Sequence, residues 1–204
     1  MDKKRVLGQF FTKDELWLKP QVLEFIKESN SAVAYNPFAG ARDLLKAAQE
    51  RCGFSEVVGL DIDDKLTWEH NDSLLNIPHL DNAIIITNPP YISNYSAARK
   101  GLTSELAKYF ASSKYNDVYL IALDKMVQAQ KNVVAIIPET FINSNYDQKI
   151  SYLALLSSKK TPLMTPRIQL SWLALMVILR VYRKSKYIKM TLTLIAWVIL
   201  KNYA

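Results

Sequence analysis

Short apolar runs alternate with longer amphipathic segments from the start of the chain to residue 138. The apolar runs have the length and the β-branched composition of buried strands, and they occupy residues 31–36, 56–61, 83–87 and 132–138. The amphipathic segments have the length and the spacing of helices, and they occupy residues 12–29, 44–51 and 116–129. Buried strands separated by helices predict an α/β fold with a doubly wound, mostly parallel sheet.

The ends of these segments carry the expected start and stop residues. Pro20 suits an early helical position, and Asn116 or Asp117 can cap the helix at 116–129. Pro138 stops the last strand because proline cannot donate to a sheet. The short apolar stretch "KLTW" at 65–68 is a candidate for one more strand.

Length and composition narrow the class of protein. A chain of 204 residues predicts one domain with one sizeable core. The single cysteine, Cys52, excludes a disulfide scaffold. The chain has only two histidines, His70 and His79, so its sequence offers no metal-ligand cluster of Cys and His. The start "MDKKRVLGQF" has no apolar segment of a signal peptide, which predicts a cytoplasmic protein.

The net charge of +7 is unevenly distributed. Residues 1–147 carry 16 Lys and Arg against 19 Asp and Glu, a net charge of −3. Residues 148–204 carry 10 Lys and Arg and no acid, and the last glycine of the chain is Gly101. The basic character therefore belongs to the tail, and charge alone is weak evidence for a nucleic-acid partner.

Candidate chemistry follows the strands in order. The turn "YNPFAGARDLL" contains Gly40, whose missing Cβ lets a ligand approach the backbone. Asp61 lies 21 residues later, at the end of the next strand, which is the spacing of a ribose-binding acid. Asp72 in "NDS" could accept from the exocyclic amine of a bound adenine. The alternatives are an ordinary glycine turn, a helix cap at Asp61 and a solvated turn aspartate at Asp72.

The segment "TNPPY" ends the strand at 83–87 with a stiff loop. Asn88 offers a side-chain carbonyl, Pro89 a backbone carbonyl, and Tyr91 a flat face. Together they could hold a planar base by its amino group, provided that the base leaves the duplex. Asn-Pro is also a common turn dipeptide, but three candidate ligand motifs upstream in the matching order favour the functional interpretation.

In this order the segments resemble the N-terminal catalytic part of an N6-adenine-specific DNA methyltransferase of the NPPY type, from bacterial restriction–modification systems. The six matching elements are "RVLGQFFTK" (5–13), "NPFAGARDLL" (36–45), "GLDID" (59–63), "NDS" (71–73), "NPPY" (88–91) and "VVAIIPETFINS" (133–144).

This resemblance implies S-adenosyl-L-methionine as the cofactor and double-stranded DNA with a flipped adenine as the partner. Asn88 and Pro89 would polarise and orient the target amine, and Tyr91 would stack on the flipped base. The catalytic residues implied are Asn88, Pro89, Pro90 and Tyr91. The cofactor-binding residues implied are Gln9, Phe10, Thr12, Asn36, Phe38, Gly40, Asp61, Ile62, Asp72 and Ser73.

Two residues depart from the family pattern in the glycine motif. The family generally has an acid where this chain has Asn36, and a small residue or glycine where it has Arg42. Arg42 could crowd the carboxylate of the cofactor or pair with it, and this change makes tight cofactor binding less expected.

The tail is the larger departure. We expect an incomplete catalytic domain in residues 1–158, an atypical acid-free tail in residues 159–204, and no target-recognition domain. A membrane helix is disfavoured, because the apolar run at 168–179 is too short and basic residues follow it. A basic DNA-binding tail and a shifted reading frame remain as explanations, and the second is preferred because the tail lacks the composition of a folded segment.

Three functions therefore stay open. The first is adenine-specific DNA methylation, impaired in this chain and dependent on a missing C-terminal recognition part or a cognate restriction endonuclease system. The second is methyl transfer to a protein glutamine or an RNA base, because the NPPY loop recognises an sp² nitrogen. The third is a fragment that binds the cofactor without transferring the methyl group.

Overall fold

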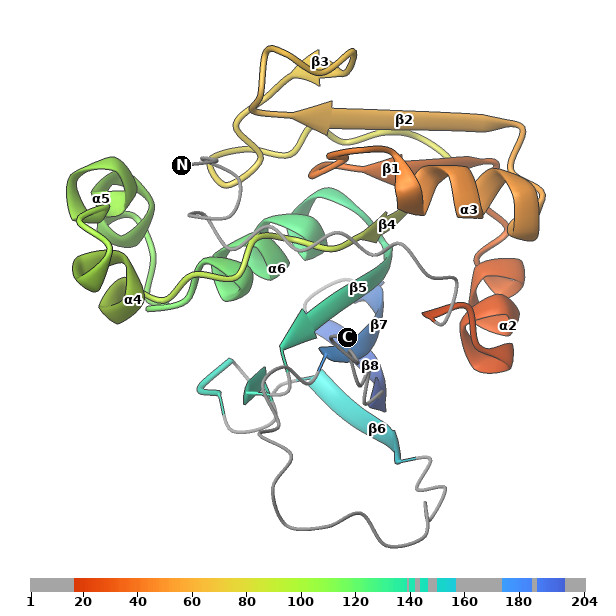
Figure 1. Cartoon of the computed structure of the whole chain (residues 1–204). Helices are drawn as coiled ribbons and strands as arrows, with labels where there is room; N and C mark the ends of the chain where they lie inside the picture. Colours follow the sequence, from red (N-terminus) through yellow and green to blue (C-terminus); the bar gives the residue numbers. More distant parts are fainter. Residues whose placement is uncertain are drawn as a thin grey trace, which may run out of the picture.

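The computed structural model describes residues 17–138, 140–141, 144–146, 150–156, 174–184 and 187–196. Its strands are β1 (Val33–Asn36), β2 (Glu56–Asp61), β3 (Glu69–His70), β4 (Ala83–Thr87), β5 (Asn132–Pro138), β6 (Ile150–Leu156), β7 (Ala174–Lys184) and β8 (Tyr187–Ala196). Its helices are α2 (Pro20–Ser29), α3 (Asp43–Cys52), α4 (Asn94–Arg99), α5 (Thr103–Ala111) and α6 (Val118–Ala129). The strands form one sheet in the order β3-β2-β1-β4-β5-β7-β8-β6 (Figure 1).

The five strands from β3 to β5 are all parallel, which confirms the predicted α/β fold. β7 pairs antiparallel with β5 and with β8, and β6 runs parallel to β8 at the far edge. The strand order reverses beside β1, because the chain adds β2 and β3 on one side and β4 on the other. Ligands of doubly wound sheets bind at such a reversal, outside the carboxyl ends of the strands.

Alternation of side chains along the strands builds two cores. In β1, Val33 and Tyr35 pack in the core that α6 covers, whereas Ala34 packs in the core of α2 and α3. In β4, Ile85 lies on the α6 side and Ile84 on the other side. Side chains of a strand point alternately to the two faces of a sheet, so both faces of the central strands are buried and their sequences are continuously apolar.

The predicted elements are largely confirmed. The strands at 56–61, 83–87 and 132–138 agree residue for residue, and the helix at 116–129 is α6 with Asp117 as its N-cap residue. Pro20 is the first residue of α2, so residues 17–19 of the predicted helix precede α2, and the part before Trp17 lies outside the described residues.

Two segments differ from the prediction. The candidate strand at 65–68 is wrong: β3 is Glu69–His70, and Trp68 instead packs over Gly59 of β2. The pattern of apolar and polar residues also did not predict α4 and α5, which lie between β4 and α6. We call residues 94–116 the α4–α5 insertion.

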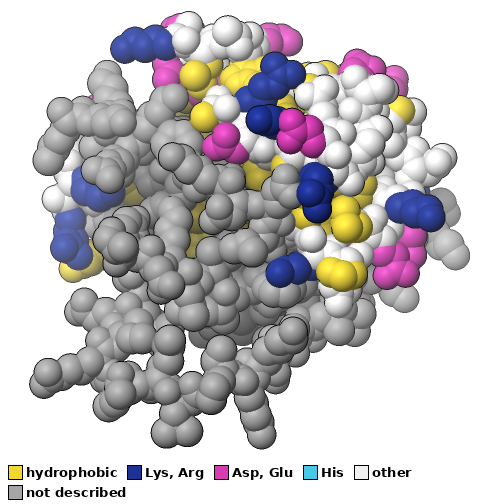
Figure 2. Space-filling model, turned by 45° about the vertical axis from the view of Figure 1, so that its right-hand side comes forward, with side chains coloured by type: hydrophobic (Ala, Val, Ile, Leu, Met, Phe, Trp, Pro, Cys, Tyr) yellow, Lys and Arg dark blue, Asp and Glu magenta, His cyan; other side chains and the backbone are white. Residues whose placement is uncertain are grey.

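The charges on the side of the molecule with α2 and α3 are mixed. Figure 2 brings this side forward, and basic and acidic side chains lie next to one another on it. One such pair is Lys46 and Glu50 of α3, with 3.8 Å between Nζ and Oε1. Among the residues that the structure describes, this surface therefore has no extended field of one sign.

Candidate active site

The carboxyl ends of β1 and β4 are joined by a buried hydrogen bond. The hydroxyl of Thr87 donates to Oδ1 of Asn36 over 2.6 Å, and both residues are about 1% exposed. The same Asn36 oxygen accepts the backbone N–H of Phe38 over 3.0 Å. These two bonds hold the glycine-containing turn after β1 against the start of the "NPPY" loop after β4.

The turn after β1 adopts left-handed backbone at two positions. Gly40 has φ +54°, and its N–H donates to Oδ2 of Asp61 over 2.8 Å. Its carbonyl accepts the indole N–H of Trp68 over 2.9 Å. Arg42 has φ +78°, a region that favours glycine. The backbone at residue 42 therefore suits a glycine better than the arginine that stands there.

The side chain of Arg42 contacts Trp68 and Gln49. Its side chain is exposed, its guanidinium lies 5.6 Å from the centroid of the Trp68 ring, and Nη2 donates to Gln49 over 3.4 Å. The guanidinium thus packs on the indole that holds the Gly40 carbonyl.

Asp61 is buried at the end of β2 and is held by backbone groups. Its Oδ1 accepts the N–H of Asp63 over 2.9 Å, while Oδ2 accepts the N–H of Gly40. Each carboxylate oxygen has two lone pairs, so both oxygens retain the capacity to accept from a ligand. The carboxylate is therefore fixed in orientation and available.

A cleft that is partly open to solvent lies beside Asp61. Its lining is mostly apolar with two carboxylates, and consists of Pro37, Phe38, Asp61, Ile62, Asn71, Asp72, Ser73, Leu74, Pro90, Ile92, Leu106, Tyr109 and Val118. An apolar cleft with a few convergent polar groups is typical of a small-molecule site.

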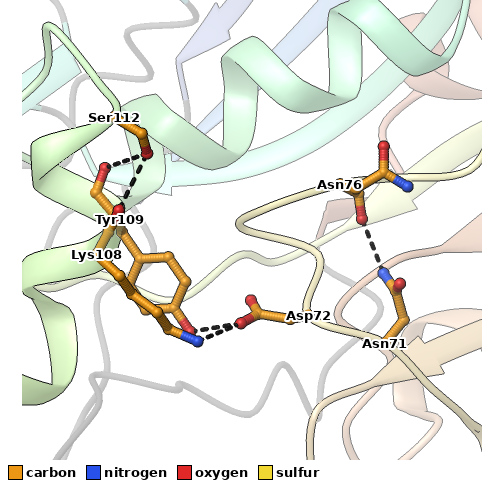
Figure 3. A network of polar contacts seen from close by, with 6 residues as sticks. All are labelled: Asn71, Asp72, Asn76, Lys108, Tyr109 and Ser112. Carbon is orange, nitrogen blue, oxygen red and sulfur yellow. Dashed lines mark hydrogen bonds and ion pairs between the residues drawn. The ribbon is translucent and has the colours of Figure 1, made fainter.

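Asp72 is held at one wall of the cleft by α5 (Figure 3). Its Oδ2 accepts from Nζ of Lys108 over 2.8 Å and from the hydroxyl of Tyr109 over 2.9 Å. The bond to Asp72 raises the pKa of Lys108. Burial first, and then the bond to Asp72, raise the pKa of Tyr109, which keeps its hydroxyl a proton donor.

The "NPPY" loop leaves β4 toward the same cleft. Pro89 and Pro90 are buried, Asn88 is half-buried, and only Pro90 of the four lines the cleft. The hydroxyl of Tyr91 contacts Oδ1 of Asn88 and donates to the backbone carbonyl of Ile136 in β5 over 2.6 Å. Burial raises the pKa of Tyr91 well above its usual value.

Most of the residues singled out in the sequence therefore gather in one place. Phe38, Asp61, Ile62, Asp72 and Ser73 line the cleft together with Pro90. Asn36 and Gly40 lie behind it, linked to Thr87 and Asp61. Gln9, Phe10 and Thr12 lie outside the described residues.

The sequence reasoning missed several residues at the site. The sequence around Trp68 and Thr87 does not indicate that they form hydrogen bonds to Gly40 and Asn36. Lys108 and Tyr109 lie 36 and 37 positions after Asp72, on a helix that the pattern did not predict. Only their position in space identifies them.

Two classes of site are not found in the described part of the chain. No group of three or more His, Cys, Asp or Glu side chains there could hold a metal ion. None of the helices there has the length and apolarity needed to cross a membrane.

Of two comparisons with known proteins, one finds a match. A search of curated proteins finds no match. Residues 10–164 match the family described as Eco57I restriction-modification methylase, and they span both the cleft and the "NPPY" loop. The match confirms the prediction of a restriction–modification methylase, and it supports DNA methylation as the activity. The chain belongs to the Eco57I restriction-modification methylase family.

Proposed function

We propose that this chain transfers the methyl group of S-adenosyl-L-methionine to the exocyclic N6 of adenine in DNA. The observation that carries the proposal is the Thr87–Asn36 bond of 2.6 Å, which places the cleft and the "NPPY" loop side by side. One side of this junction fits a nucleoside, and the other presents an amide that can hold an amine.

The cleft fits the adenosyl part of the cofactor. Asp61 would accept from the ribose hydroxyls, because both of its oxygens are fixed by backbone N–H groups and retain lone pairs. Phe38 and Ile62 supply apolar walls for the purine. Gln9, Phe10 and Thr12 are proposed to contact the methionine end. When bound, the cofactor supplies an electrophilic methyl group on a sulfonium centre.

Asp72 is proposed to accept from the amino group of the cofactor's adenine through Oδ1. Its Oδ2 is occupied by Lys108 and Tyr109, which fixes the plane of the carboxylate. A fixed acceptor costs less entropy on binding than a mobile one. Ser73, buried next to it, completes this wall.

Asn88 is proposed to accept one N–H of the target amine, and the carbonyl of Pro89 the other. A phenol has a single proton, and that of Tyr91 is directed to the Ile136 carbonyl. We infer that the Asn88 amide meets the hydroxyl through its NH₂ group, which turns the amide oxygen toward the amine. Two acceptors on one amine leave its lone pair directed at the methyl group.

No covalent enzyme nucleophile is required. The work of these residues is positioning and charge stabilisation, which together account for large rate enhancements. Tyr91 is proposed to present its ring to the flipped base while its hydroxyl stays anchored on β5. The catalytic domain is proposed to occupy residues 1–158, and β7 and β8 of the following segment extend its sheet beside β5.

The test is transfer of labelled methyl groups from S-adenosyl-L-methionine to unmodified genomic DNA, followed by digestion to nucleosides. We expect label in N6-methyladenine and a loss of roughly 100-fold or more for Asn88→Ala. Asn76→Ala is the matched control, because the Asn76 side chain is exposed and its contact with Asn71 uses the backbone carbonyl.

Other outcomes would identify another function. Label in N4-methylcytosine, in RNA or in protein glutamine would refute adenine as the target. Cofactor binding without transfer to any acceptor would refute the catalytic proposal for this chain.

A further inference from the structure

The α4–α5 insertion projects from the sheet directly after the "NPPY" loop. Its base is closed by an antiparallel bridge between Ser93 and Asp117. The N–H of Asn94 donates to the carbonyl of Asn116 over 2.8 Å, and α4 is capped by Ser93, whose Oγ accepts the N–H of Ser96 over 3.0 Å. In Figure 1 the insertion lies at the opposite end of the molecule from α2 and α3.

The insertion is positively charged, whereas the surrounding domain is negatively charged. Residues 94–116 contain four basic side chains and one acid, a net charge of +3. The remaining residues of the range 17–138 contain eight basic and thirteen acidic side chains, a net charge of −5. The insertion is therefore the part of this range that would attract a polyanion.

An exposed aromatic side chain stands on the same surface. Tyr95 of α4 is 72% exposed, an unusual position for a large ring, and it is four residues beyond Tyr91 of the "NPPY" loop. The guanidinium of Arg99 lies 5.8 Å from the Tyr95 ring centroid, one helical turn further on. Lys100 follows at the end of the helix and is exposed.

We propose that the α4–α5 insertion is a DNA-contacting surface of the catalytic domain. Arg99 and Lys100 bind backbone phosphates of the strand that carries the target adenine, and Tyr95 stacks on a base beside the extruded one. This inference rests on the proposed DNA substrate. Basic side chains beside an exposed ring are the combination that binds single-stranded or opened nucleic acid.

The phosphate contacts are tested with the full chain and a fluorescein-labelled DNA duplex of mixed sequence, by anisotropy at several salt concentrations. Each phosphate contact adds about 0.9 to the slope of log affinity against log salt. The double variant Arg99→Ala, Lys100→Ala should lower the slope by about 2 and the affinity by at least about tenfold. All variants keep residues 148–204, so the charge of that segment cancels in the comparison.

A matched control removes the same charge elsewhere. Lys46 and Arg51 are exposed on α3, on the side with mixed charges. Lys46→Ala, Arg51→Ala should leave the slope close to that of the wild type. An equal loss in both double variants would overturn the proposal, because it would show a general charge effect, and so would an unchanged slope for Arg99→Ala, Lys100→Ala.

The role of Tyr95 is tested with the same duplex carrying one unpaired adenine. Tyr95→Ala should reduce the preference for this duplex over the fully paired one by about tenfold, while Tyr95→Phe should keep it. Equal preferences in both variants and the wild type would overturn the stacking contact. Alanine and phenylalanine at an exposed helical position leave the fold intact, which circular dichroism verifies.

Failure of the two proposals can be told apart. If the wild type methylates adenine but the insertion variants bind DNA normally, the surface is wrong and the function stands. If the insertion variants lose DNA binding but the wild type transfers no methyl group, the surface stands and the function is wrong.

Discussion

The contact between Gly59 and Trp68 gives the sharpest test of how the site is held together. A Cβ added at Gly59 would lie 2.4 Å from Cε3, 2.7 Å from Cδ2 and 2.8 Å from Cζ3 of the Trp68 ring. Carbon atoms in contact are normally about 3.5–4.0 Å apart, so in Gly59→Ala the ring must retreat by about 1 Å. That movement would break the 2.9 Å bond from the indole to the Gly40 carbonyl.

The expected loss of stability in Gly59→Ala follows from these displacements. Overpacking costs about 1–3 kcal/mol and the lost hydrogen bond about 1 kcal/mol. Replacing a strand glycine by alanine returns about 0.5–1 kcal/mol through the unfolded chain. We therefore expect Gly59→Ala to lower the free energy of unfolding by about 2 kcal/mol.

The assay is urea unfolding followed by circular dichroism, in a double-mutant cycle. In the Trp68→Ala background no ring opposes the new methyl group, so Gly59→Ala should be neutral or slightly stabilising. The coupling energy between the two positions should then be about 2–3 kcal/mol. A coupling energy below about 0.5 kcal/mol would refute the reasoning, because Gly59→Ala would then act without the indole.

Three further predictions use the same structure. The free energy of unfolding in urea should be about 1 kcal/mol higher for Arg42→Gly than for Arg42→Ala. Both variants lack the guanidinium, and only glycine adopts φ +78° without strain. Equal unfolding midpoints for the two variants would exclude backbone strain at this position. Burial raises the pKa of Tyr119 to about 12, so the folded state holds a proton that the unfolded state loses from about pH 10 upward. Stability should fall as the pH rises from about 10 to 12, and Tyr119→Phe should reduce that fall; an identical alkaline profile would contradict the assignment. Lys108→Met should weaken S-adenosyl-L-methionine binding several-fold in calorimetry by releasing Asp72, while Lys114→Met should not; equal affinities in the two variants would remove Lys108 from the site.

The fold was predictable because its central strands are buried on both faces. Such strands are continuous apolar runs, so the segments at 83–87 and 132–138 are unmistakable and end in Thr87 and Pro138 as observed. The short helices α4 and α5 were not predictable. α4 is six residues long and buries only Ala97, so it has no apolar stripe to detect.

The site was predictable only where it depends on position along a strand. Asp61 is the last residue of β2 and Asn88 follows β4, and parallel strands bring their carboxyl ends to one edge. The side chains that fix these residues come from elsewhere in the sequence. Trp68 is 28 residues from Gly40 in the sequence, and Tyr109 is 37 residues from Asp72. A local sequence pattern cannot predict hydrogen bonds between residues this far apart in the chain.

The structure shows what Asn36 does at a position where the resemblance predicts an acid. An asparagine oxygen accepts from Thr87 and Phe38 as a carboxylate would, so the junction between β1 and β4 survives without a buried charge. Relative to an acid at this position, one negative charge is missing near the proposed cofactor, whose sulfonium is positive. Asp72 compensates little, because Lys108 already offsets its charge. It follows that this cleft would hold its ligand by acceptors of fixed direction on Asp61 and Asp72, rather than by net electrostatic attraction.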